Sequence, residues 1–145
     1  MYFVDRETIH ATLSYMEEQI AFFEAQTSWS TRLSELALER CTHVIIESII
    51  DVGNSMIDGF IMRDPGSYED IIEILEDEKV ITPDMKPPLV KVIQLRKLLV
   101  QEFTTLSHSH LEETLRNHLS ELQAFAPAVR DYLTNELGPV SAFRN

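Results

Sequence analysis

The chain has 145 residues, with 12 lysines and arginines against 24 aspartates and glutamates and a formal net charge of −12. Its length suits about one domain with a core that needs no metal or disulfide, and its single cysteine, Cys41, cannot form an internal bridge. The negative net charge disfavours broad nucleic-acid binding. No apolar run approaches the ~20 residues that span a bilayer, so we expect a soluble, cytoplasmic protein without a membrane partner.

The first predicted helix spans about residues 5–26. Asp5 is a suitable N-cap, because its carboxylate can accept hydrogen bonds from the free N–H groups of the first turn. Apolar residues then recur at steps of three and four, which places them on one face: Ile9, Leu13, Met16, Ile20 and Phe23.

A second, long helix is predicted to begin at Ser30 or Thr31, whose hydroxyls can cap it, and to continue to about Ile61. Such a helix is much longer than the average of ~11–12 residues. We therefore expect either a bend at Gly53 or an end at Gly59.

The segment 63-RDPGSYED-70 is predicted to form a turn, because it contains a proline and a glycine side by side. Ser67 with Asp70 then resembles a capping box. This pair predicts a short acidic helix over residues 68–78.

The fourth predicted helix runs from about Pro88 to about Thr105. It contains the one locally basic part of the chain, since residues 86–101 carry lysine and arginine but no acidic residue, whereas residues 64–84 are strongly acidic. Within it lies the stretch 95-LRKLLVQEF-103.

The fifth predicted helix opens with a capping box of Ser109 and Glu112, reaches Asn135, and is stopped by Gly138 and Pro139. There is no internal repeat and no alternating strand pattern. The sequence predicts a single all-α domain over the whole chain, with four long helices and one short one.

A polar band follows the second helix, where His43, Glu47 and Asp51 recur every four residues. Imidazole and carboxylates on one helix face can bind a transition metal. However, no E-x-x-H pair occurs, and the fourth helix offers no carboxylate or histidine before Glu102. We predict a hydrogen-bonded polar face here, with no metal site and no cofactor.

Three histidines lie close together in 107-SHSHLEETLRNH-118, where an exposed helix start accounts for them better than a metal or catalytic site. Nucleophilic catalysis has no support either, because Cys41 has apolar and small neighbours and no G-x-S-x-G elbow occurs. The glycines are isolated, so there is no phosphate-binding loop.

Three segments in order, 35-ELALERCTHVIIESIIDVGNSMID-58, 67-SYEDIIEILEDEKVIT-82 and 95-LRKLLVQEF-103, resemble the HepT-like proteins of the HEPN superfamily. The resemblance implies an antiparallel helical bundle that pairs into a homodimer, with the sites of both subunits lining one cleft. It also implies relatives that are RNA-cleaving toxins, often encoded beside a small nucleotidyltransferase antitoxin.

The signature that the resemblance supplies is R-N-x-L-V-H-x-Y, in which imidazole transfers a proton near the 2′-hydroxyl and guanidinium holds the phosphate, without a metal. Arg96 matches the arginine and Lys97 the polar residue after it. Gln101 stands at the histidine position and cannot transfer a proton near neutral pH, and Phe103 replaces the tyrosine and has no hydroxyl to be nucleotidylated. Whether the chain is an enzyme is therefore left open by this motif.

The leading hypothesis is a HepT-like homodimer with a decayed or weakened ribonuclease site that still binds RNA or a nucleotide. Weak cleavage would survive if His108 or a carboxylate reached the cleft. The alternative is a non-catalytic interaction protein whose acidic short helix binds a basic partner. The candidate binding residues are Arg96, Lys97, Phe103, Glu47 and Asp51.

Overall fold

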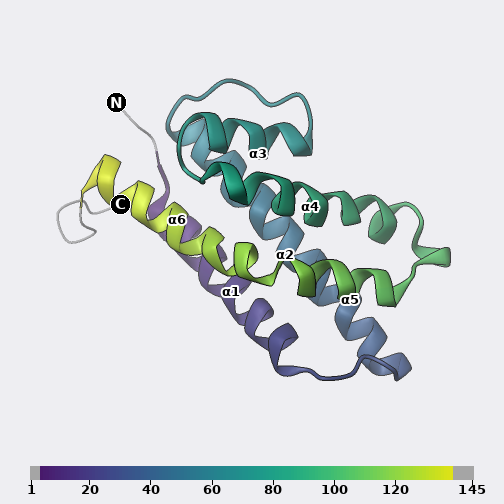
Figure 1. Cartoon of the computed structure of the whole chain (residues 1–145). Coiled ribbons are helices and arrows are strands. Elements are labelled where there is room, and N and C mark those ends of the chain that lie inside the picture. The colour runs from purple at the N-terminus through teal and green to yellow at the C-terminus, as the bar shows by residue number, and fades with distance from the viewer. Residues whose placement is uncertain (1–3, 139–145) are drawn as a thin grey trace.

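The computed structural model describes residues 4–138, and within them the chain is entirely helical, without a β-strand. Figure 1 shows the helices gathered around α2, which runs through the middle of the molecule. The α-helices and two short 3-10 helices are α1 (Arg6–Ala25), α2 (Arg32–Gly59), α3 (Tyr68–Asp77), η1 (Pro83–Met85), α4 (Lys86–Val100), η2 (Phe103–Thr105), α5 (His108–Asn117) and α6 (Leu119–Leu137).

Three of the predicted helix starts are confirmed by their hydrogen bonds. Asp5 accepts from the Thr8 N–H at 3.1 Å, and Thr31 accepts from the Ser34 N–H at 3.0 Å in a reciprocal capping box. Ser67 likewise accepts an N–H bond at the start of α3. In each case a short polar side chain satisfies a donor that the helix itself cannot.

The predicted cap of α5 is wrong by two residues. Ser107, and not Ser109, accepts the His110 N–H at 3.3 Å, so that α5 already begins at His108. α6 ends at Leu137, two residues beyond the predicted Asn135, and Gly138 follows it as the predicted stop with φ of 84°. Pro139, which we expected to help stop it, lies outside the described residues.

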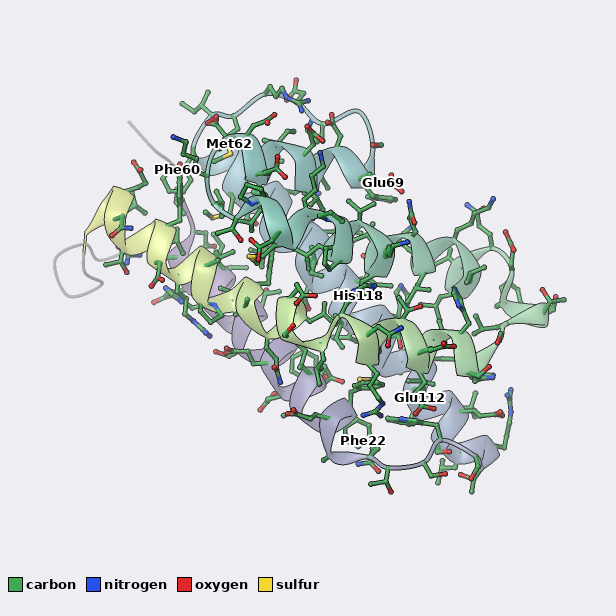
Figure 2. All side chains as sticks on the ribbon, in the orientation of Figure 1. Phe22, Phe60, Met62, Glu69, Glu112 and His118 are labelled. Carbon is green, nitrogen blue, oxygen red and sulfur yellow. The ribbon has the colours of Figure 1, made fainter. Side chains whose placement is uncertain are left out.

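The predicted fifth helix is two helices, α5 and α6, which meet at His118 (Figure 2). Asn117 and His118 are both weak helix formers, and φ of −117° with ψ of 21° takes His118 out of the helical region. Pro127, in contrast, lies inside α6 without ending it. Local propensity at the junction therefore decides the division.

α4 ends at Val100, five residues before the predicted end. The Lys97 carbonyl accepts both the Gln101 N–H at 2.9 Å and the Glu102 N–H at 3.2 Å, which closes the helix. The aromatic and β-branched residues of η2 that follow are poor helix formers. Consequently, Gln101 caps α4 and Phe103 lies outside it.

α2 is the central helix of the core, because it packs against α1, α3, α4 and α5. Gly53 is fully enclosed where α3 crosses α2, and a Cβ there would overlap Cγ2 of Ile71. The glycine therefore permits close packing of the two helices. Gly59, as predicted, is the last residue of α2.

α1 and α6 run antiparallel, as two pairs of contacts show. Arg130 donates to Glu17, and Gln123 donates to Glu24, about two turns later on α1 and two turns earlier on α6. At the C-terminal end of α2, Phe60 packs edge to face on Tyr132 of α6, with ring centroids 5.1 Å apart. Among the helices of residues 4–138, none is long and apolar enough to cross a membrane.

Candidate functional site

Arg96, the arginine of the signature, projects from α4 towards α2 and α3. Its Nε donates to Oε1 of Glu47 on α2 at 2.7 Å, and its Cζ lies 4.7 Å from the centre of the Tyr68 ring on α3. The hydrogen bond that Arg96 donates to Glu47 is the main cause that raises the pKa of Arg96 above its ordinary value. Three helices thus fix one guanidinium that keeps 27% of its side chain exposed.

His43 lies one turn before Glu47 on α2 and joins the same cluster. Its Nε2 is 3.3 Å from Oε1 of Glu47, the oxygen that also accepts from Arg96. The side chains of His43 and Glu47 are 34% and 36% exposed. The four-residue spacing of the polar band produces this pair, because residues i and i+4 of a helix lie on one face. We refer to His43, Glu47, Tyr68 and Arg96 as the Arg96 cluster.

Asp51, the next residue of the polar band, is not among the contacts of Arg96. It lines two grooves between α1 and α2, the larger of about 520 Å³. Glu47 reaches the edge of the larger groove, together with Tyr15 and Arg40. The structure therefore brings Glu47 to Arg96 and leaves Asp51 on the side of α1.

Lys97 points away from the Arg96 cluster, as expected for the next residue on a helix. It lines a groove of about 600 Å³ between α4 and α5. Its Nζ lies 3.6 Å from Oε2 of Glu102, and its side chain is 69% exposed. The structure does not bring Lys97 and Arg96 to one surface.

Gln101 and Phe103, the altered positions of the signature, lie at the hairpin between α4 and α5. Gln101 is exposed at the end of α4, and Phe103 is 62% exposed in η2.

His108, which we considered as a substitute imidazole, is held by α2. Its Nε2 lies 2.7 Å from Oε2 of Glu39, and its Nδ1 lies 3.6 Å from Oε2 of Glu35. Only 18% of its side chain is exposed. Both ring nitrogens face carboxylates, so His108 ties α5 to α2.

No group of three or more histidine, cysteine, aspartate or glutamate residues could hold a metal ion within residues 4–138. His43 and Glu47 alone provide too few ligands for a structural site, which usually has four. The Arg96 cluster contains a guanidinium, which can bind an anion, and an imidazole, which can take or give a proton.

Sequence reasoning missed Tyr68. The residue opens α3 directly after its cap, where it reads as an ordinary helix start, and its ring reaches Arg96 only because α3 packs beside α4. The four-residue spacing of His43 and Glu47 was visible, but nothing in the sequence showed which helix they face.

An all-helical bundle that carries an arginine on α4, within the stretch 95-LRKLLVQEF-103, fits the HepT-like proteins of the HEPN superfamily. The family model described as "Ribonuclease HepT-like" matches residues 6–129. The chain therefore belongs to the HepT-like family. The fold and family predicted from the three segments are confirmed.

The chain is 51% identical over 144 residues to the protein named "Putative RNase YutE" from Bacillus subtilis (strain 168), covering 99% of this chain and 100% of YutE. A solved structure of YutE, described as a cytosolic protein of unknown function, gives a TM-score of 0.95 at 52% identity, covering 99% of this chain and 100% of that one. The tri-AMPylated HEPN toxin of Shewanella oneidensis, solved in complex with MNT antitoxin, gives a TM-score of 0.72 at 18% identity. The match covers 86% of this chain and 95% of the toxin chain. The last similarity shows the fold alone.

Proposed function

We propose that this protein binds RNA at Arg96 and that its ribonuclease chemistry is weakened, because Gln101 stands where the family signature has a histidine. The observation that carries the proposal is the fixed orientation of Arg96 between Glu47 and the ring of Tyr68. A guanidinium held in place loses less conformational freedom when it binds a phosphate.

The geometry of the guanidinium supports phosphate binding. Glu47 accepts from Nε, which is one of three guanidinium nitrogens, and a bidentate phosphate contact needs two N–H groups. The ring of Tyr68 is 44% exposed and can stack on a base beside that phosphate. A phosphate with an adjacent base is the repeating unit of a single-stranded RNA.

Gln101 accounts for the weakened chemistry. An amide side chain can donate and accept hydrogen bonds, but it neither takes nor gives a proton near neutral pH. General acid or base catalysis at that position typically contributes about 10²–10⁴-fold to a rate. We expect slow RNA cleavage by this protein and much faster cleavage by the Gln101→His variant.

The experiment compares RNA binding and cleavage by the wild type, Arg96→Ala and Arg32→Ala. Arg32 is a matched control, because it is an exposed arginine that pairs only with Glu35 at 3.5 Å, within its own helix. Binding of mixed-sequence single-stranded RNA, measured by fluorescence anisotropy, should weaken about tenfold or more in Arg96→Ala and by less than about twofold in Arg32→Ala. Equal loss in both variants would show that only net charge matters.

The family also suggests which partners this protein binds, and these are part of the same proposal. We propose a homodimer with the two Arg96 clusters in one cleft, a single domain over the whole chain, and a cytosolic location like that described for YutE. A nucleotidyltransferase antitoxin is the expected partner. It would not modify position 103, because Phe103 has no hydroxyl.

The alternative of an acidic interaction protein has less support. The carboxylates of α3 are partly neutralised within the chain, since Asp70 and Asp77 face Arg63 and Glu73 pairs with Lys86. If neutralising Glu73 and Asp77 removed a protein partner while Arg96→Ala had no effect, this alternative would replace RNA binding.

A further inference from the structure

Two side-chain contacts fix how the chain between Arg96 and His108 lies along α2. Arg96 contacts Glu47, and His108 contacts Glu39, eight residues earlier on α2. α4 therefore ends at the end of the bundle where α2 begins, as Figure 1 also shows. His43 lies midway between Glu39 and Glu47 on α2.

The same register places His43 level with the altered position of the signature. At 1.5 Å per residue, moving from Arg96 to the end of α4 at Gln101 covers about 7.5 Å. Moving from Glu47 to His43 covers about 6 Å along α2 in the same direction. An imidazole is thus present at the depth of the bundle where the signature would put one, but it comes from another helix.

Glu47 gives this imidazole an orientation. Nε2 of His43 is the ring nitrogen that lies near Glu47, at 3.3 Å, so Nδ1 is the nitrogen that can take a proton from a substrate. A carboxylate that fixes the tautomer of a histidine is a common arrangement behind a general base. Because Glu47 accepts from Arg96 and lies 3.3 Å from His43, one carboxylate stands beside both the phosphate-binding group and the imidazole.

The other histidines are placed for different roles. His108 is held between Glu35 and Glu39, and His110 and His118 line the groove between α4 and α5. His10 lies on α1, where burial and the nearby Arg130 lower its pKa. All five histidines lie within the described residues, and His43 is the one that contacts the partner of Arg96.

We propose that His43 is the general base of the remaining ribonuclease reaction and replaces the histidine that the signature has at position 101. The inference rests on the proposed binding of RNA at Arg96. Nδ1 of His43 takes the proton of a 2′-hydroxyl while the 2′-oxygen bonds to the adjacent phosphorus and the P–O5′ bond breaks. The leaving 5′-oxygen takes a proton from water, and His43 then returns its proton to solvent. The products carry a 2′,3′-cyclic phosphate and a 5′-hydroxyl.

The test measures cleavage and binding of the same fluorescent single-stranded RNA by the full-length protein. His43→Ala and His43→Gln should each reduce the cleavage rate about a hundredfold or more, while the Kd for RNA changes less than about twofold. His110→Ala is the control for loss of an exposed histidine and should cleave at the wild-type rate. Mass spectrometry of the wild-type products should show the cyclic phosphate.

A double variant separates a chemical role of His43 from a structural one. Gln101→His added to His43→Ala should restore cleavage, because it returns an imidazole to the same depth of the bundle. Failure of this rescue, or wild-type cleavage by His43→Ala, would refute the inference. Wild-type protein that binds RNA but never cleaves it would also refute it while leaving RNA binding at Arg96 intact. If no RNA binds at all, the proposed function itself is wrong.

Discussion

Replacing Gly53 by alanine tests whether close packing of α3 on α2 holds the Arg96 cluster together. The new Cβ would overlap Cγ2 of Ile71, and it would also meet Cδ1 of Leu75 at 3.7 Å. Ile71 is 2% exposed and β-branched, so it has little freedom to rotate away. The strain must be relieved by moving α3, which carries Tyr68.

Two opposing terms determine the size of the effect. Alanine in place of glycine inside a helix stabilises by about 0.8–1 kcal/mol, whereas overpacking a core typically costs about 1–3 kcal/mol. The net expectation for Gly53→Ala is a loss of stability of up to about 2 kcal/mol. In a chain of this size each kcal/mol lowers Tm by roughly 2–4 °C.

Gly66→Ala is the matched control. Gly66 lies in the turn before α3, and a Cβ there would meet only Oδ2 of Asp70 at 3.8 Å, an ordinary contact. Urea unfolding followed by circular dichroism should show Gly53→Ala less stable than the wild type and Gly66→Ala unchanged or slightly more stable. RNA affinity should fall in Gly53→Ala alone. A Gly53→Ala protein about 1 kcal/mol more stable than the wild type would refute the packing argument.

Three further predictions concern single groups. Hydrogen bonds from Arg63 hold the pKa of Asp70 at about 2, below its ordinary value of 3.8. The ionised Asp70 therefore stabilises the folded protein fully above pH 3.8, and this contribution is lost as the pH falls towards 2. Unfolding midpoints in urea should therefore fall more steeply over this range in the wild type than in Arg63→Gln, and parallel curves would contradict the assignment. Burial raises the pKa of the Cys41 thiol to about 11, so iodoacetamide should modify it only after unfolding, and rapid modification of folded protein would count against the buried position. Tyr68→Ala should weaken RNA binding about two- to fivefold through loss of the cation–π contact with Arg96, and Tyr68→Phe should retain it; equal affinities of the two variants would show that the ring does not matter.

Helix starts were the most predictable part of the fold. Asp5, Thr31 and Ser67 cap helices because the side-chain oxygen of each accepts a hydrogen bond from the backbone N–H three residues later. This property depends only on the local sequence. Ends and breaks were less predictable. The stop of α4 at Val100 and the break at His118 depend on weak local preferences that compete with packing of the long apolar stripes.

The candidate site could be predicted only in part. Arg96 and Glu47 were both singled out, one by the signature and one by the polar band, and the structure joins them at 2.7 Å. Lys97 was expected beside Arg96, but the 100° turn between neighbouring helix residues directs it to the groove between α4 and α5. That these candidates bind or cleave RNA remains a prediction.

The sequence by itself determined the helical class, most helix starts, the family and the loss of histidine and tyrosine from the signature, because each of these is written in local patterns of side chains. Only the tertiary structure decided which faces meet. The antiparallel packing of α4 on α2 brings Arg96 to Glu47, which His43 also approaches, and the close approach of α3 at Gly53 brings Tyr68 to the guanidinium. Contacts between residues some fifty positions apart depend on how whole helices pack, which no local pattern specifies.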